Sequence, residues 1–360
     1  GRGGWTSNVY QDASEVSSWY LSGGGGVALE WPFGGGRGSI SGGADYRALT
    51  YPDEDLKYAE WVFGLAGSYH FSGGFWFRIG AKWERLVDPV QIQDSGLQRR
   101  DNFYPYLDLG LQNVGGSKFN LTAGVSMQKY YYHDEDYDTG SREQYRAYIK
   151  GSYPVFREST LVFLRYDYYH TRADSDRIND LDRGGELSFG LEGVIPLGST
   201  QKLTGTLQFG YRNNDYATGS YVDDGVEQQT DDNDSKGIFT VKAMLRYLAS
   251  ARTSLQIMYY RDLDYSTYSN YQVVDRFDLV VTHTLLRDLL LRGGTYLRFS
   301  QPDAERDSIT EFGVGVGARY ILIDNVDLDL SADWLDRQSG EDAYTYSRFI
   351  FGLGVTLYFR

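Results

Sequence analysis

The sequence predicts an all-β protein, a transmembrane antiparallel β-barrel of about 18 strands, and the accuracy of strand boundaries leaves about 16 open. Three observations predict this fold. Apolar and polar residues alternate with a period of two along the chain, short and long polar connections alternate as well, and no helical pattern is convincing. A helical membrane protein is excluded, because no uninterrupted apolar stretch approaches the roughly 18 residues that a spanning helix needs.

Composition excludes several classes of protein. The chain has 360 residues, a net charge of −14 and no cysteine, which excludes a disulfide scaffold, a thiolate zinc site, a cysteine nucleophile and c-type haem attachment. The 32 tyrosines and only 7 prolines argue against disorder. An acidic balance also disfavours nucleic acid as a partner, since the phosphate backbone needs Lys and Arg. The end-to-end repeat predicts a single barrel domain over 1–360.

The last segment of the chain shows the alternation most clearly. One face carries Phe349, Phe351, Leu353, Val355, Leu357 and Phe359, and the other carries Arg348, Ile350, Gly352, Gly354, Thr356 and Tyr358. The same pattern occurs at 75–84, 119–128, 311–320 and 326–334. A strand with two different faces explains it.

The connections predict the strand number. Short turns are expected near 34–37, 72–74, 115–117, 155–159, 197–200, 249–252, 286–288 and 322–325. Longer polar loops are expected near 11–16, 52–57, 88–101, 134–142, 173–183, 214–235, 267–271, 302–308 and 339–344. These connections separate about 18 strands, each of roughly 10 residues within the bilayer.

A soluble sandwich or propeller would also alternate, so the choice depends on what the two faces carry. The polar faces are rich in Gly and Tyr and hold charges of both signs, which suits a lumen. The apolar faces carry large aromatics near their ends, such as Tyr320, Trp334, Phe349 and Phe359, which suits the interfacial girdles of a membrane barrel. A propeller would repeat a signature of roughly 40 residues, and none is visible.

Charge is divided between the loops and the rest of the chain. The long loops hold 28 Asp or Glu against 7 Lys or Arg, so they net −21 and the remainder nets +7. We therefore expect the long acidic loops to be extracellular, the short turns and both termini to be periplasmic, and the protein to lie in the bacterial outer membrane. Gly1 is not an initiator Met, so a secretory signal is expected to have been removed.

The C-terminus resembles the assembly signal of bacterial outer-membrane proteins. Alternating hydrophobics run through Gly354 and Leu357 to the aromatic Phe359, and Arg360 departs from a strictly terminal Phe by one residue. The resemblance implies recognition by the outer-membrane assembly machinery. An ordinary last strand facing lipid would need the same residues.

Two further stretches support a family resemblance. The segments 26–33 and 42–51, with 83–89 and the closing residues Arg319, Tyr320, 336–339 and 346–348, resemble β-barrel porins of the porin 2 type. The resemblance extends from end to end but is diffuse. It implies an outer-membrane barrel, often associated with exopolysaccharide export, and it implies no catalytic residue.

Catalytic and metal sites are weakly supported. The four histidines, His70, His133, His170 and His283, show no clear Ser partner, so rim or interfacial positions and a non-enzymatic protein are expected. The longest loop partly resembles a calcium loop at Asp231, Asp232 and Asp234, but Lys236 occupies a ligand position. We therefore expect a solvated acidic loop, no cofactor and no resident metal.

The inward faces carry the remaining candidate site. The predicted pore-lining residues are charged and fall on the polar face of their strands: Arg78, Lys82, Arg165, Arg212, Arg292, Arg298, Arg319, Asp327, Asp329, Asp333 and Arg348. Such charges either stabilise the barrel as pairs or select the passing solute. The sequence therefore predicts a porin-like pore for anionic solutes or exopolysaccharide. The alternative is a structural or partner-bearing barrel subunit without a free pore. Expected partners are the lipid bilayer, lipopolysaccharide and a polysaccharide or periplasmic export partner.

Overall fold

The computed structural model describes most of the chain. Its described residues are 2–6, 18–52, 56–89, 97–133, 141–155, 159–173, 181–195, 203–216, 220–223, 226–229, 235–264, 271–302, 308–340 and 345–357. The predicted residues Phe359, Asp231, Asp232 and Asp234 lie outside them. No helix in the described part of the chain is long and apolar enough to cross a membrane.

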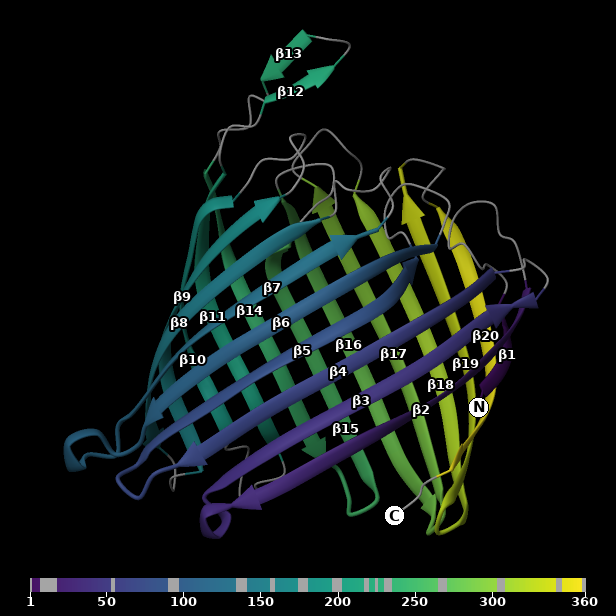
Figure 1. Cartoon of the computed structure of the whole chain (residues 1–360), viewed down its shortest axis with the longest axis horizontal. Coiled ribbons are helices and arrows are strands. Elements are labelled where there is room, and N and C mark those ends of the chain that lie inside the picture. Colours follow the sequence, from purple (N-terminus) through teal and green to yellow (C-terminus); the bar gives the residue numbers. More distant parts are fainter. Residues whose placement is uncertain are drawn as a thin grey trace.

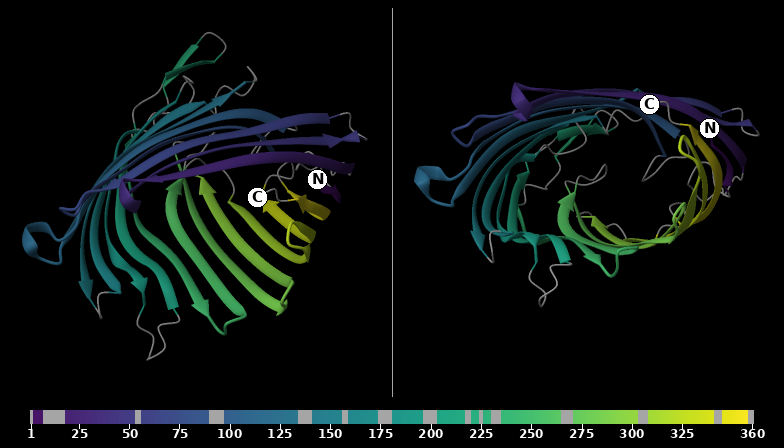
Figure 2. Two further views of the ribbon diagram at one scale, coloured as in Figure 1. Left: turned by 60° about the horizontal axis from the view of Figure 1, so that its bottom comes forward. Right: turned by 90° about the horizontal axis from the view of Figure 1, so that it is seen from below.

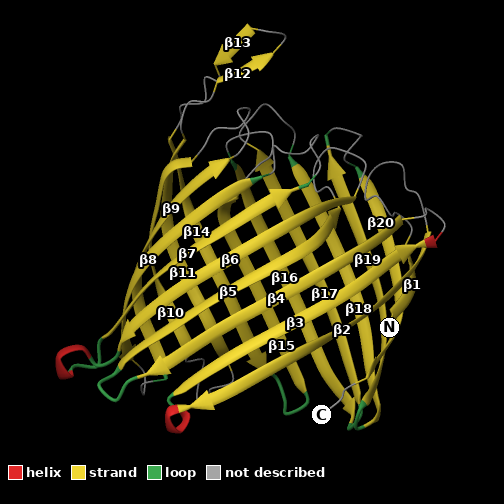
Figure 3. Cartoon of the chain, viewed as in Figure 1, coloured by secondary structure: helices red, strands yellow, loops and turns green. Residues whose placement is uncertain are grey.

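Nearly all described residues belong to one antiparallel sheet of 18 strands (Figures 1 and 3). The strands are β1 (Arg2–Thr6), β2 (Ser18–Phe33), β3 (Gly38–Tyr51), β4 (Leu56–His70), β5 (Phe75–Pro89), β6 (Leu97–Leu111), β7 (Asn120–Tyr132), β8 (Arg142–Val155), β9 (Thr160–Ala173), β10 (Leu181–Val194), β11 (Leu203–Tyr216), β14 (Ser235–Leu248), β15 (Thr253–Asp264), β16 (Gln272–Leu286), β17 (Leu289–Pro302), β18 (Ile309–Ile323), β19 (Val326–Ser339) and β20 (Tyr346–Leu357).

Each strand pairs with its neighbours in sequence, and the short strand β1 pairs with both β2 and β20. The sheet therefore closes on itself as an 18-strand barrel, which confirms the predicted fold class. Seen along its axis the wall forms a flattened ring (Figure 2). The described connections at one end are short and include two 3₁₀ turns, η1 (Gly34–Gly36) and η3 (Val114–Gly116). The long connections leave from the other end (Figure 1).

Three boundary predictions need correction. The strands other than β1 are 12 to 16 residues long, so they extend beyond a span of roughly 10 residues. Pairing between β5 and β6 takes in much of the predicted loop at 88–101, because Pro89 lies opposite Leu97. The predicted loop at 214–235 contains a separate hairpin, β12 (Ser220–Asp223) and β13 (Val226–Gln229). Alternating residues at strand ends were too polar for the pattern to mark them.

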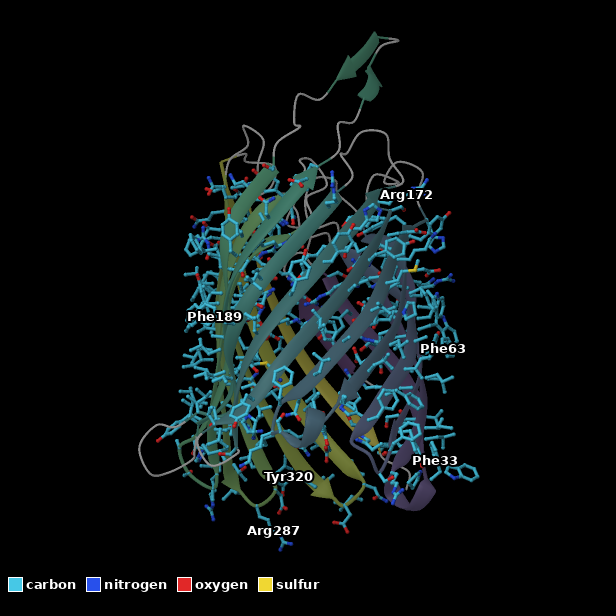
Figure 4. All side chains as sticks on the ribbon, turned by 90° about the vertical axis from the view of Figure 1, so that its left-hand side faces the viewer. Phe33, Phe63, Arg172, Phe189, Arg287 and Tyr320 are labelled. Atoms are coloured by element: carbon cyan, nitrogen blue, oxygen red, sulfur yellow. The ribbon has the colours of Figure 1, made fainter. Side chains whose placement is uncertain are left out.

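The two faces of the barrel differ as predicted. Side chains of one parity are exposed and apolar, and Phe63 and Phe189 project from the wall at mid-height (Figure 4). Outward aromatics cluster towards both ends. Near the turns, the rings of Phe33 and Tyr69 are 5.7 Å apart, and nearer the loops those of Phe63 and Trp83 are 5.5 Å apart. Such bands are typical of a barrel surrounded by lipid.

Candidate functional site

The candidate site is the inward face of the barrel. Residues paired across neighbouring strands point to the same side of a sheet, so the register can be followed around the ring. Arg78 lies opposite Asp108, and further round the ring Asp278 lies opposite Tyr296. The same parity places all eleven predicted pore-lining residues on the inward face. Gly354 lies there too, whereas Leu357 of the predicted assembly signal faces outward and is exposed.

The wall formed by β8–β15 is filled by ion pairs. Asp167 accepts hydrogen bonds from Arg146 at 2.8 Å and from Arg165 at 2.7 Å, and it has no exposed surface. Asp262 on β15 lies 2.9 Å from Arg212 on β11 and 2.8 Å from Lys242 on the strand between them. A carboxylate can be buried in this way only when cations and donors compensate for lost hydration.

Glu186 is the centre of this wall. It is fully buried, and one carboxylate oxygen accepts a 2.8 Å hydrogen bond from Thr240 while the other accepts one of 3.0 Å from Tyr169. Lys242 lies 3.1 Å from the same carboxylate. Glu186 and Asp262 were not among the predicted site residues. Counting the period of two back from Ser188 would have placed Glu186 on the inward face, but no sequence pattern indicates that it would be buried.

Aromatic rings complete the filled wall. The guanidinium of Arg165 lies 4.0 Å from the centre of the Tyr148 ring, and that of Arg212 lies 4.2 Å from the Tyr169 ring. These cation–π contacts hold the long arginine side chains against the wall instead of leaving them in the lumen. The tyrosines predicted as sugar-stacking platforms are therefore partly covered by the protein's own cations.

The opposite wall is lined by small residues. Two inward-facing cavities, of about 800 Å³ and 560 Å³, lie against β2–β5 and β16–β20. Both are lined by Arg292, Gly317 and Ser331, so they adjoin each other along the barrel. Glycine is required here at Gly313, because a Cβ atom would overlap the ring of Tyr296. The free space of the barrel therefore lies beside β2 and β16–β20, away from the ion-paired wall.

The predicted arginines fall into two groups. Arg78, Arg165, Arg212 and Arg319 make ion pairs of 2.6 to 2.9 Å. Arg292 and Arg348 line the open cavities and make no ion pair with any described residue. Lys82 pairs with Glu84, and Asp327 and Asp329 both lie near Arg319. Asp333 lines the smaller cavity.

Arg298 belongs to a separate cluster near the loop end. Its Nη1 lies 3.6 Å from Glu311, and Arg337, which is buried and was not predicted, approaches the other oxygen of Glu311 at 3.8 Å. Two guanidinium groups therefore share one carboxylate. Arg337 sits on the polar parity of β19 at a predicted strand exit, where the alternation was hard to read.

The histidines lie near the ends of the barrel. His133 is 3.2 Å from Asp101 at the loop end, and His283 Nδ1 is 2.9 Å from the hydroxyl of Thr253 at the turn end. His70 stacks on Trp76, and His170 stacks on Tyr145. Within the described ranges, no group of three or more acidic or histidine side chains is arranged to hold a metal.

Comparison with known proteins gives the fold. No protein family matches the sequence. No curated protein matches it either. Among solved structures, the FrpB iron transporter from Neisseria meningitidis (F5-1 variant, apoprotein form) aligns with a TM-score of 0.51 at 10% identity, over 94% of this chain and 61% of that one. The chain folds as an outer-membrane β-barrel.

Two further structures are similar at lower scores. The alcaligin outer-membrane receptor FauA from Bordetella pertussis has a TM-score of 0.49 and 13% identity, over 98% of this chain and 64% of that one. The copper transporter OprC has 0.47 and 12%, over 95% and 62%. This outer-membrane barrel thus spans less than two thirds of the length of each of these structures. The narrower resemblance to porins of the porin 2 type stays a prediction.

Proposed function

We propose that the protein is a porin-like channel of the bacterial outer membrane that passes small anionic solutes, including acidic saccharides. The observation that carries the proposal is the division of the interior into a filled wall and an open one. A barrel of 16 to 18 strands is wide enough to leave an aqueous channel. Here the two cavities beside Arg292 provide continuous space along the open wall.

Charge supports a preference for anions. Arg292 and Arg348 face the open cavities without an ion pair among the described residues. Carboxylates near them are largely engaged elsewhere: Asp278 by Arg276 at 2.7 Å, and Asp329 by Arg319 at 2.7 Å. Charges in a confined lumen with low-dielectric walls are focused, whereas the acidic loops are screened over roughly 8 Å at physiological salt. The arginines should therefore decide selectivity.

The outer surface supports lipopolysaccharide as a partner. Above the apolar belt, outward-facing charges gather towards the loop end, where Arg85 pairs with Asp101 and Lys129 pairs with Glu143. Arg172 projects at the same end (Figure 4). Phosphates of a lipid headgroup region would be matched by these cations. We propose no catalytic role.

Single-channel recording tests the channel directly. Purified protein in a planar bilayer should give steady open steps and a reversal potential of the sign for anions under a salt gradient. Silence under all voltages would favour the alternative, a structural or partner-bearing barrel subunit of a larger complex. In that case the described cavities would be filled by another protein or by the chain's own loops. Exopolysaccharide passage would be tested by whether an acidic polysaccharide blocks the steps.

A further inference from the structure

The strand β1 closes the barrel over only part of its height. It has five residues, and its register places Arg2 opposite both Ser22 of β2 and Gly354 of β20. Beyond Ser22 towards the turn end, β2 continues from Gly23 to Phe33. Along that stretch its pairing within the described ranges is with β3 alone, so one edge of β2 has no strand beside it. The lower part of β2 is therefore an open sheet edge.

Exposure agrees with an open edge. On this stretch the inward-facing Ala28 and Glu30 are exposed together with the outward-facing Leu29 and Trp31, which are 72% and 75% exposed. A strand flanked on both sides would have its inward side chains partly covered by neighbours. β2 and β20 diverge towards the turn end (Figure 2, left).

The larger cavity lies at this seam. Its lining includes 22–26 on one side and 354–356 on the other. It reaches the inward-facing Arg319 and the outward-facing Leu330, so residues of both faces of the wall contribute. This composition is expected of a gap through the sheet.

Such a gap cannot face lipid as it stands. Each backbone N–H or C=O left unpaired in the hydrocarbon region costs several kcal/mol, and for this reason open edges do not occur there. We propose that the edge from Gly23 to Phe33 accepts a further strand, formed by a segment of this chain that precedes Gly1 and continues β1 in line. A second polypeptide could pair with the same edge, but it would have to end where β1 begins.

The geometry favours a continuation of the same chain. β1 is antiparallel to both neighbours, so residues on its N-terminal side would enter between Gly23 and Val355 without a turn. A segment joined to β1 also pairs intramolecularly, which raises its effective concentration over any free peptide. The register predicts its pattern: apolar residues opposite Val27, Leu29 and Trp31, and small or polar residues between them.

Disulfide trapping tests the pairing. The chain has no cysteine, so an engineered pair is unambiguous. Residues 1–360 are extended before Gly1 by a strand of the predicted pattern, with one residue for each position from Gly23 to Phe33. Leu29→Cys is combined with a cysteine at the position that the register places opposite it. We expect an oxidant to join the two. The matched control moves the second cysteine by one residue, which turns it to the other face and should abolish the bond.

Hydrogen exchange gives a second readout that does not depend on cysteine geometry. In residues 1–360 the β2 amides that point away from β3 should exchange fast, and the extension should slow them by about a hundredfold or more. Absence of both the disulfide and the protection in the extended chain would overturn the proposal. So would protection of these amides in residues 1–360 alone. Protection by the same peptide added separately, but not when fused, would assign the edge to a partner. A barrel without a free pore needs this strand equally, so silence in a bilayer would leave the result unaffected.

Discussion

The ammonium group of Lys242 lies 3.1 Å from the carboxylate of Glu186, a side chain with no exposed surface. The two residues are on β14 and β10, with β11 between them, so their contact reaches over a whole strand. It ties together the filled side of the barrel and leaves the open side to the solute.

The first prediction concerns the stability of this contact. Lys242→Met removes the cation and leaves a buried carboxylate, which should lower the free energy of unfolding by about 3 kcal/mol. Denaturant unfolding in detergent micelles measures it. Lys82→Met is the matched control, because the pair with Glu84 is half-exposed and should cost less than about 1 kcal/mol. Equal losses in the two variants would show that Glu186 is hydrated.

The second prediction concerns ion selectivity. Replacing Arg292, Arg298 and Arg319 together by Ser should shift the reversal potential towards cations. One charge at contact distance in water changes an ion's energy by about 1 kcal/mol, so the permeability ratio should change roughly fivefold or more.

A matched triple variant separates lumen charge from overall charge. Arg85, Lys129 and Arg261 face outward in ion pairs of 2.6 to 2.8 Å, and their replacement by Ser should leave the reversal potential unchanged. If both triple variants shift it equally, net charge and not the lumen decides. A cation-selective wild type would mean that the acidic loops dominate.

The third prediction concerns the small-residue lining. Gly313→Val would force the ring of Tyr296 away from the wall, because a Cβ atom there overlaps it. We expect a loss of about 1–3 kcal/mol in unfolding free energy and a smaller single-channel conductance. Gly64→Val is the control, since it also faces inward but has nothing within 4 Å of the added Cβ. Conductance lowered equally by both variants would show that the lining position is immaterial.

The fourth prediction concerns orientation in the membrane. Phe189 faces outward at mid-height (Figure 4), so Phe189→Arg should lower the free energy of unfolding in lipid vesicles by about 2–4 kcal/mol. The same change at the outward-facing Tyr145, near the loop end, should cost about 0–1 kcal/mol. A similar cost at both positions would place the membrane boundary elsewhere.

The sequence by itself determined the faces of the strands. A period of two separates neighbouring residues onto opposite sides of a sheet, so Arg319 and Tyr320 could be assigned without coordinates, and the register agrees with both assignments. The alternation of short and long connections likewise determined the strand number. These features are local, since each depends only on residues a few positions apart in the chain.

Only the tertiary structure decided which inward residues meet. Glu186 and Lys242 are far apart in sequence, and their contact depends on the order of strands around the ring and on its flattened shape. The same closure buries Asp167 and leaves Arg292 beside open space, although both are charged residues of one parity. Periodicity contains no information about curvature or about distances across a barrel, so it could not separate a structural ion pair from a charge that meets the solute.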